Sequence, residues 1–168
     1  MQLPALPFFP VGQHHLTNGW PPLWWVGCHG GAGTTTLAAV TGLGVDAGAA
    51  WPTPIPGWPA PQVVLVCRAT ATGALAATGV VEQWRRQPVL SGTKILGLVT
   101  VEASARRPPR RAAERLQMLA GWIPAKWRVG WVEEYLAADD PRELGIPPDV
   151  AALRHALDRA LASTPHIS

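Results

Sequence analysis

Four short apolar segments, each followed by a stretch with helical character, constrain the fold of this chain more than any other feature of its sequence. They lie at residues 23–27 (LWWVG), 63–67 (VVLVC), 94–103 (KILGLVTVEA) and 127–132. Continuous runs of β-branched and aromatic residues are typical of strands that are buried on both faces. Parallel strands need crossover connections, which are nearly always right-handed helices. The alternation therefore predicts an α/β fold with about four mostly parallel strands covered by helices.

Four stretches carry the helices of this prediction, at residues 33–41, 73–87, 108–122 and 147–163. Three of them place apolar residues at helical spacing, which predicts the faces that meet the core. These residues are Leu75, Val80, Val81 and Trp84 in the second helix, Leu116, Met118 and Leu119 in the third, and Val150, Leu153, Leu157 and Leu161 in the fourth.

Two segments rich in proline lie outside this alternation. We interpret residues 1–22 as an extended arm that docks on a single domain, residues 23–168, through the apolar side chains of Phe8, Phe9 and Trp20. Residues 42–62 carry a proline every few positions, which excludes a regular helix and any central strand. This second segment is predicted to be a long ordered loop.

Composition excludes several classes of protein. Hydrophobic residues make up 48% and charged residues 15% of the chain, which favours a folded protein over a disordered one. The net charge of +3 favours anionic partners but is small beside that of a dedicated nucleic-acid binder. Cys28 and Cys67 have neither zinc-site nor disulfide-scaffold spacing, so we expect both to be reduced and buried. The chain has no basic signal-peptide region and no run of eighteen apolar residues, which predicts a cytoplasmic protein with no membrane span.

The first strand and the first helix are joined by CHGGAGTTT, residues 28–36. Glycines let the backbone curl so that successive N–H groups and a helix N-terminus converge on one anion. The candidate phosphate-binding residues are His29, Gly30, Gly31, Ala32, Gly33, Thr34, Thr35 and Thr36. The loop pattern G-x-x-x-x-G-K-[ST] also needs a lysine, and a hydroxyl for magnesium. Thr35 stands at the hydroxyl position and is the candidate magnesium ligand, whereas Thr34 replaces the lysine and Cys28 the first glycine.

The stretch HGGAGTTT resembles the deviant phosphate loop of the MinD and ParA family of partitioning and positioning ATPases, whose motif reads K-G-G-x-G-K-[ST]-[ST]. His29 stands at the position of the family's signature lysine, and Thr34 at that of its loop lysine. Residues 63–84 and 94–103 resemble later strands and a helix of the family, so the likeness runs loosely over residues 23–136. The resemblance implies a Rossmann-like P-loop fold, with ATP and magnesium as the expected cofactors.

The departures from the family concern hydrolysis. Family members carry two further acidic strand ends, one in switch I and one in a Walker B strand. Asp46 in VDAG is the candidate remnant of the switch I acid, and the Walker B strand is expected to be missing. A charge-assisted hydrogen bond contributes about 1.5–3 kcal/mol, so each lost lysine contact costs roughly ten- to a hundredfold in affinity. Backbone cradling of phosphate survives such a loss, but the transition state of hydrolysis relies on positioned positive charge and metal. We therefore expect no catalytic residues and weak or absent nucleotide binding.

A second candidate for anion contact is SARRPPRR, residues 104–111, which follows the third strand. Its Arg106, Arg107, Arg110 and Arg111 either contact phosphate, nucleic acid or an acidic partner, or belong to a solvated, proline-stiffened loop. The carboxyl ends of parallel strands lie at one edge of a sheet, so these arginines and His29 are candidates to restore the charge of the glycine loop.

Three functions remain open on this evidence. The first is a degenerate P-loop pseudo-ATPase that acts as a regulatory or adaptor protein in the maintenance or transfer of a plasmid or mobile element, as the resemblance implies. The second is a basic interaction module for nucleic acid or protein, in which the glycine loop is purely structural. The third is a slow NTPase that uses the arginines or a lysine from another subunit. The expected partner is a protein or DNA, with a homodimer also possible.

Overall fold

The computed structural model describes residues 2–130 and 134–163 of the chain. Its central sheet has five strands in the order β3-β2-β5-β6-β7, and every neighbouring pair is parallel. The strands are β2 (Trp24–Gly27), β3 (Val45–Asp46), β5 (Gln62–Arg68), β6 (Lys94–Val101) and β7 (Lys126–Val129). The expected α/β fold with a parallel sheet is confirmed, but the described sheet has one strand more than the apolar segments predicted. The last predicted strand ends at Val129, and residues 131–133 lie outside the described residues.

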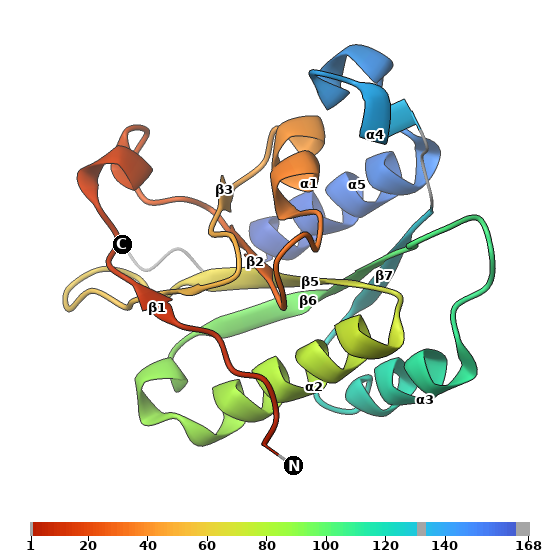
Figure 1. Ribbon diagram of the computed structural model, residues 1–168. Coiled ribbons are helices and arrows are strands. Elements are labelled where there is room, and N and C mark those ends of the chain that lie inside the picture. Colours follow the sequence, from red (N-terminus) through yellow and green to blue (C-terminus); the bar gives the residue numbers. More distant parts are fainter. Residues whose placement is uncertain (1, 131–133, 164–168) are drawn as a thin grey trace.

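Helices cover both faces of the sheet (Figure 1). α1 (Thr34–Thr41) and α5 (Pro148–Ala162) lie on one face, and α2 (Ala71–Arg86) and α3 (Arg110–Leu119) lie on the other. The short α4 (Glu134–Ala137) stands beyond α1, between β7 and α5 in the chain. The described residues also contain three single-turn 3₁₀-helices, at Gln13–Leu16, Pro88–Leu90 and Pro141–Leu144.

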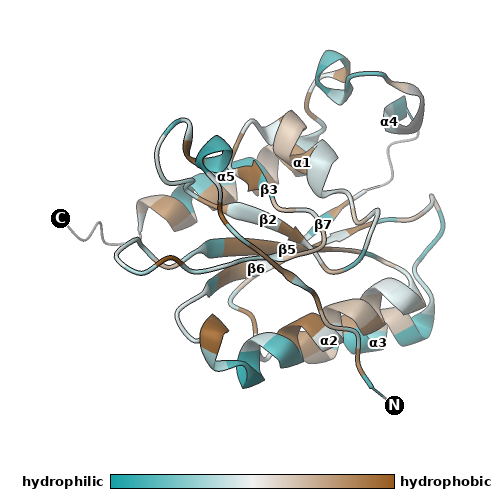
Figure 2. Cartoon of the chain, turned by 60° about the vertical axis from the view of Figure 1, so that its left-hand side comes forward, coloured by the Kyte–Doolittle hydropathy of each residue, from teal (hydrophilic) through white to brown (hydrophobic). Residues whose placement is uncertain are grey.

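The central strands supply two separate cores. Alternate residues of β5 face opposite ways, with Val63 and Leu65 packed toward α2 and α3, and Val64 and Val66 packed toward α1 and α5. All four side chains are fully buried. Figure 2 shows the consequence, with hydrophobic strands enclosed between helices whose outer surfaces are more hydrophilic. The prediction that the continuous apolar runs form strands buried on both faces is therefore confirmed for β5.

Met118 is a predicted core position that the structure contradicts. Leu116 and Leu119 of α3 are buried, but Met118 is 76% exposed. With roughly 3.6 residues per turn, a residue two positions after Leu116 lies on the opposite side of the helix. The buried face of α3 is therefore a narrow stripe that Ala112 shares with the two leucines.

The proline-rich segment contains two short strands that the sequence did not predict. β3 forms the edge of the main sheet beside β2, and β4 (Trp51–Pro52) pairs in parallel with β1 (Phe8–Phe9) of the arm. Proline is tolerated in such places because an edge strand does not need every backbone N–H for pairing. The exclusion of a central strand from this segment is confirmed.

The N-terminal arm is fixed by a buried glutamine of α2. The Gln83 side chain accepts a hydrogen bond from the Leu6 N–H (2.9 Å) and donates one to the Leu6 carbonyl (2.8 Å). Its oxygen also accepts the indole N–H of Trp51 at 2.9 Å. Gly79 lies beneath the arm, where an added Cβ would meet the carbonyl oxygen of Pro4. The arm is therefore an integral layer over α2 and the proline-rich segment.

Candidate functional site

The candidate site lies where the connections of the sheet change direction. The chain leaves β2 through α1 toward β3 on one side, whereas β5, β6 and β7 follow one another on the other side. In open α/β sheets, ligands bind at the carboxyl ends of the strands at such a switch point. The glycine loop follows β2 and Arg68 ends β5, so both lie at this point.

The backbone of the glycine loop has the conformation that its glycines permit. Gly31 has a φ of 72° and Gly33 a φ of 109°, values that residues with a side chain rarely adopt. Gly33 caps α1 without a side-chain hydrogen bond, whereas Thr70 caps α2 by accepting from the Gly73 N–H. The first N–H groups of a helix have no intrahelical partner. Among the described residues, nothing accepts the N–H groups of residues 33–35, so this end of α1 is available to an anion.

Thr35 has an acidic partner across the loop. Its hydroxyl donates to Asp46 Oδ2 at 2.6 Å, and the other carboxylate oxygen accepts the Gly48 N–H at 2.8 Å. Asp46 ends the edge strand β3, which lies directly beside β2. The sequence had offered Asp46 only as a candidate remnant of an acidic strand end. The fold brings it to the one hydroxyl that the loop pattern assigns to magnesium.

His29 does not direct charge into the loop. Its Nδ1 lies 2.8 Å from the Gly30 carbonyl, and its Nε2 accepts the Arg68 backbone N–H at 3.0 Å. One donor and one acceptor fit the neutral imidazole with its proton on Nδ1. Both ring nitrogens are therefore engaged within the protein, and the ring ties the glycine loop to the end of β5.

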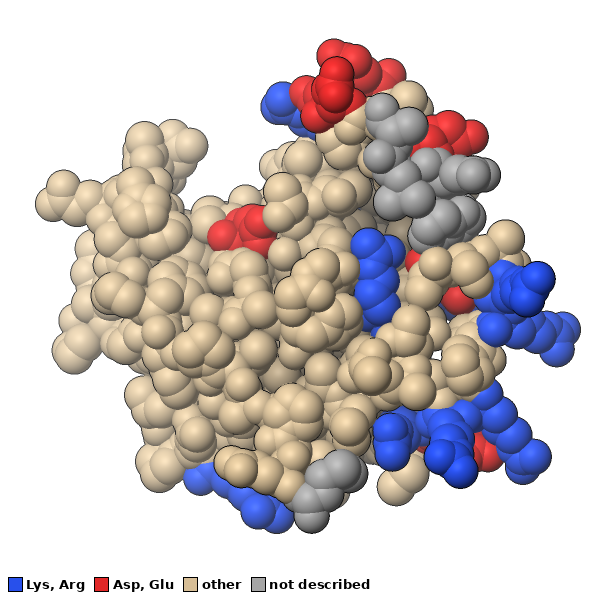
Figure 3. Space-filling view, viewed as in Figure 1, with Lys and Arg blue, Asp and Glu red and all other residues tan. Residues whose placement is uncertain are grey.

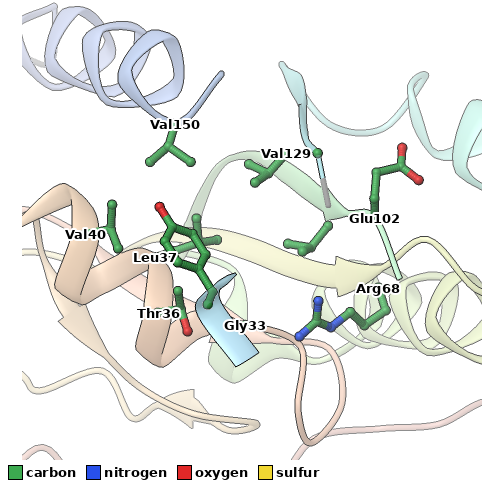
Figure 4. A pocket seen from close by; sticks show the side chains of 11 residues that line it. Gly33, Thr36, Leu37, Val40, Arg68, Glu102, Val129 and Val150 are labelled. Atoms are coloured by element: carbon green, nitrogen blue, oxygen red, sulfur yellow. The ribbon is translucent and has the colours of Figure 1, made fainter. Parts of the chain in front are cut away.

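Arg68 is the site residue that sequence reasoning missed. Its Nε donates to the Gly31 carbonyl at 3.0 Å, across 37 positions of sequence. The guanidinium extends from the end of β5 toward the side of a small cavity on which Gly33 and Thr36 lie (Figure 4). A signal was present, since Arg68 directly follows the clearest strand, and the carboxyl ends of parallel strands are where ligands bind.

The cavity beside the loop has a volume of about 90 Å³ and opens between α1, α5 and the ends of β5, β6 and β7. Its walls are largely apolar, with Val40, Val129 and Val150 around the interior (Figure 4). Glu102 also lines it and is 6% exposed, but its carboxylate points away and pairs with Arg128. Drug-sized ligands usually occupy pockets of roughly 300–1,000 Å³. The cavity in this conformation therefore accommodates only a small group.

The arginine-rich loop does not reach the glycine loop. Arg106, Arg107, Arg110 and Arg111 are all exposed, and none of them lines the cavity. Arg110 pairs with Glu114 on the surface of α3 at 2.8 Å. Figure 3 shows basic side chains gathered over α3 and the segment before it, and acidic side chains gathered over α4 and the turn that follows. These arginines form a separate basic surface.

The remaining candidates have structural roles. Cys28 and Cys67 are free and buried, as expected. Within the described residues, no group of three His, Cys, Asp or Glu side chains is arranged to hold a metal ion. Trp84 donates its indole N–H to the Thr93 carbonyl, and Trp127 packs against Gly97. None of the helices in residues 2–130 and 134–163 combines the length and apolarity needed to cross a bilayer.

A scan against protein-family models, a search of curated proteins and a search of solved structures each found no match. Fold and site geometry are therefore the basis for the functional conclusion.

Proposed function

We propose that the glycine loop binds the phosphate groups of a nucleotide together with magnesium, and that the protein hydrolyses this nucleotide slowly or not at all. The observation that carries the proposal is the Thr35–Asp46 pair beside the uncapped start of α1. In P-loop proteins, magnesium is held by the loop Ser or Thr and by the Asp of a Walker B strand. Thr35 and Asp46 have those residue types, and Asp46 reaches the hydroxyl from the edge strand β3 instead of from a Walker B strand.

Magnesium suits this pair because the ion prefers oxygen ligands and is usually bound through one or two carboxylates plus substrate phosphates. The Thr35 hydroxyl and the Asp46 carboxylate supply two such oxygens, and a phosphate lying on the loop supplies more. The loop contributes backbone N–H groups and the start of α1, which favour negative charge. The proposal therefore couples the binding of the nucleotide phosphates to the binding of magnesium.

Slow or absent turnover follows from what replaces the loop lysine. Thr34 stands at that position and carries no charge. Phosphoryl transfer is catalysed mainly by positioning and by positive charge on the transferring group. Glu102, the buried carboxylate nearest to the cavity, is paired with Arg128 and turned away from its interior. A pseudo-ATPase related to the MinD and ParA family, regulating or adapting a partner in the maintenance or transfer of a mobile element, fits this combination.

A second candidate function is a basic interaction module for DNA or an acidic protein. It is favoured by Arg106, Arg107 and Arg111, which are exposed and form no ion pair with any described residue. In that case the glycine loop is a purely structural turn that binds no ligand.

Fluorescence titration with an ATP analogue, with and without magnesium, tests the proposal. Gly31→Val introduces a side chain at a positive φ, which costs about 1–2 kcal/mol of strain. Gly57→Val is the matched control, because Gly57 has a φ of 84° in an exposed loop and equal space around it. We expect wild type and Gly57→Val to bind in a magnesium-dependent manner, Asp46→Asn to lose that dependence, and Gly31→Val to lose binding.

The opposite outcomes favour the second candidate. Absence of binding at millimolar nucleotide contradicts the proposal. Steeply salt-dependent DNA retention that is lost in an Arg106→Ala, Arg107→Ala double variant indicates the interaction module instead. Phosphate release at roughly 1 s⁻¹ or faster, the range of ordinary enzymes, contradicts the expectation of slow or absent turnover.

A further inference from the structure

We propose that Arg68 supplies the positive charge of the phosphate site, from the neighbouring strand rather than from the loop. The inference rests on the proposed function and adds a ligand-binding residue to it. It assigns the site a ligand with a chain of phosphate groups, which a guanidinium contacts through two parallel hydrogen bonds.

Two hydrogen bonds fix Arg68 against the glycine loop. Its backbone N–H donates to His29 Nε2 at 3.0 Å, and its side-chain Nε donates to the Gly31 carbonyl at 3.0 Å. The first bond positions the start of the side chain, and the second positions the guanidinium plane. A flexible side chain held at both ends loses less conformational entropy when a ligand binds.

The rest of the guanidinium is available. An arginine side chain has five N–H donors, of which the bond to Gly31 uses one. Nη1 and Nη2 donate to no described residue, and Arg68 forms no ion pair with any described acid. Glu102 lines the same cavity but is occupied by Arg128. The charge of Arg68 is therefore left uncompensated by the described part of the chain.

A second polar group near the loop also lacks a partner. Thr34, at the first position of α1, is 7% exposed, and its hydroxyl makes no hydrogen bond with any described residue. Its oxygen is not among the fully buried polar atoms that lack a partner, so it is accessible to solvent or to a ligand. Two donors without a protein partner, the Thr34 hydroxyl and the free part of the Arg68 guanidinium, come from different elements and flank the same uncapped helix start. A phosphate oxygen is an acceptor that suits both.

The test is the affinity of the purified protein for magnesium ATP and for magnesium tripolyphosphate, measured by calorimetry. The variants are Arg68→Gln and Arg68→Lys, and the control is Arg159→Gln, which removes one exposed positive charge from α5. We expect Arg68→Gln to weaken both ligands by about ten- to a hundredfold, as loss of a charge-assisted contact does. Arg68→Lys keeps the charge and loses the fork, so we expect a smaller loss, and Arg159→Gln binds as wild type does.

Failure of this inference and failure of the proposed function give different results. If wild type binds and Arg68→Gln binds equally well, Arg68 is not part of the site and only this inference is overturned. If wild type binds neither ligand, the proposed function is wrong and the inference is overturned with it.

A measurement on wild type guards against an Arg68→Gln variant that does not fold. Phenylglyoxal modifies accessible guanidinium groups, and peptide mass spectrometry locates the modified residues. We expect magnesium ATP to protect Arg68 at least tenfold while Arg106 and Arg107 react at an unchanged rate. Equal modification of Arg68 with and without saturating ligand overturns the inference.

Discussion

Gln83 is the residue on which the attachment of the N-terminal arm depends. Its side chain is 7% exposed and hydrogen-bonds both backbone groups of Leu6 and the indole of Trp51. A buried amide that satisfies its partners in this way joins three segments far apart in sequence: the arm, the proline-rich segment and α2.

Gln83→Ala should lower the free energy of unfolding by about 2–4 kcal/mol, because it leaves buried donors and an acceptor unpaired. Gln117→Ala is the control, since Gln117 is an exposed residue in the interior of α3 and should change stability by less than about 0.5 kcal/mol. Urea denaturation measures both. Equal stability of the two variants would contradict the role of Gln83.

His15 makes the stability of the arm depend on pH. Burial against its aromatic neighbours lowers the pKa of His15, and the nearby His14 lowers it further. The folded state therefore binds protons more weakly at this site than the unfolded state does. Its contribution to stability is present above the ordinary histidine value of about 6.5 and is lost as the pH falls through that value toward the lowered pKa.

We expect the free energy of unfolding to decrease between pH 7.5 and pH 5.5 in a wild-type series of chemical denaturations. His15→Gln should reduce this decrease, and His155→Gln, on the exposed surface of α5, should not. A pH dependence that is the same in both variants would mean that other groups cause it.

The two cysteines should be inert in the folded protein. Burial raises the pKa of Cys67 to about 12. Burial also raises the pKa of Cys28 well above its usual range, and the nearby Cys67 thiol adds to this shift. Thiolates are the reactive form, so neither thiol should react with Ellman's reagent at pH 8 within an hour. Both should react in denaturant, and rapid labelling of either one in the native protein would refute this.

At the site, the sequence predicted the residues whose role is local. Gly31 and Gly33 adopt positive φ angles because the loop must turn sharply within a few residues, and glycine spacing reveals this directly. Asp46 and Arg68 could not be assigned with the same certainty, because their partners lie 11 and 37 positions away in sequence. Such contacts depend on strand order, which no local pattern encodes.

At the scale of elements, long β-branched runs were predicted well and short edge strands were not. β5 and β6 are seven and eight residues long and stand out by composition. β3 and β4 have two residues each, which is too short for alternation or a continuous run to appear, and they lie in a segment rich in glycine and proline. Yet β3 is the element that brings Asp46 to the site.

β6 and β7 meet at a close contact between Gly97 and the ring of Trp127. A Cβ added to Gly97 would overlap that ring and approach the Ala125 carbonyl at 2.8 Å. Gly97→Ala should therefore cost about 1–3 kcal/mol of stability through overpacking. In a double-mutant cycle measured by thermal denaturation, Trp127→Leu should recover part of that loss. Strictly additive effects of the two substitutions would show that the ring is not the obstacle.

At the scale of the whole molecule, strand order determines where chemistry can occur. Because the connections diverge at β2 and β5, one loop and one strand end face each other at the carboxyl edge of the sheet. The exposed arginines of residues 106–111 lie apart from that point, over α3 and the segment before it. The proposed phosphate site and the exposed basic surface are thus separate parts of the molecule.

The central claim, that the glycine loop takes up phosphate with help from Asp46 and Arg68, is tested most directly by amide NMR. Magnesium ATP would be titrated into ¹⁵N-labelled protein while the backbone N–H signals are followed. The account predicts that the largest saturable shifts fall on residues 29–36, Asp46 and Arg68, with little change at residues 106–111. Shifts confined to residues 106–111, or none at millimolar ligand, would contradict it.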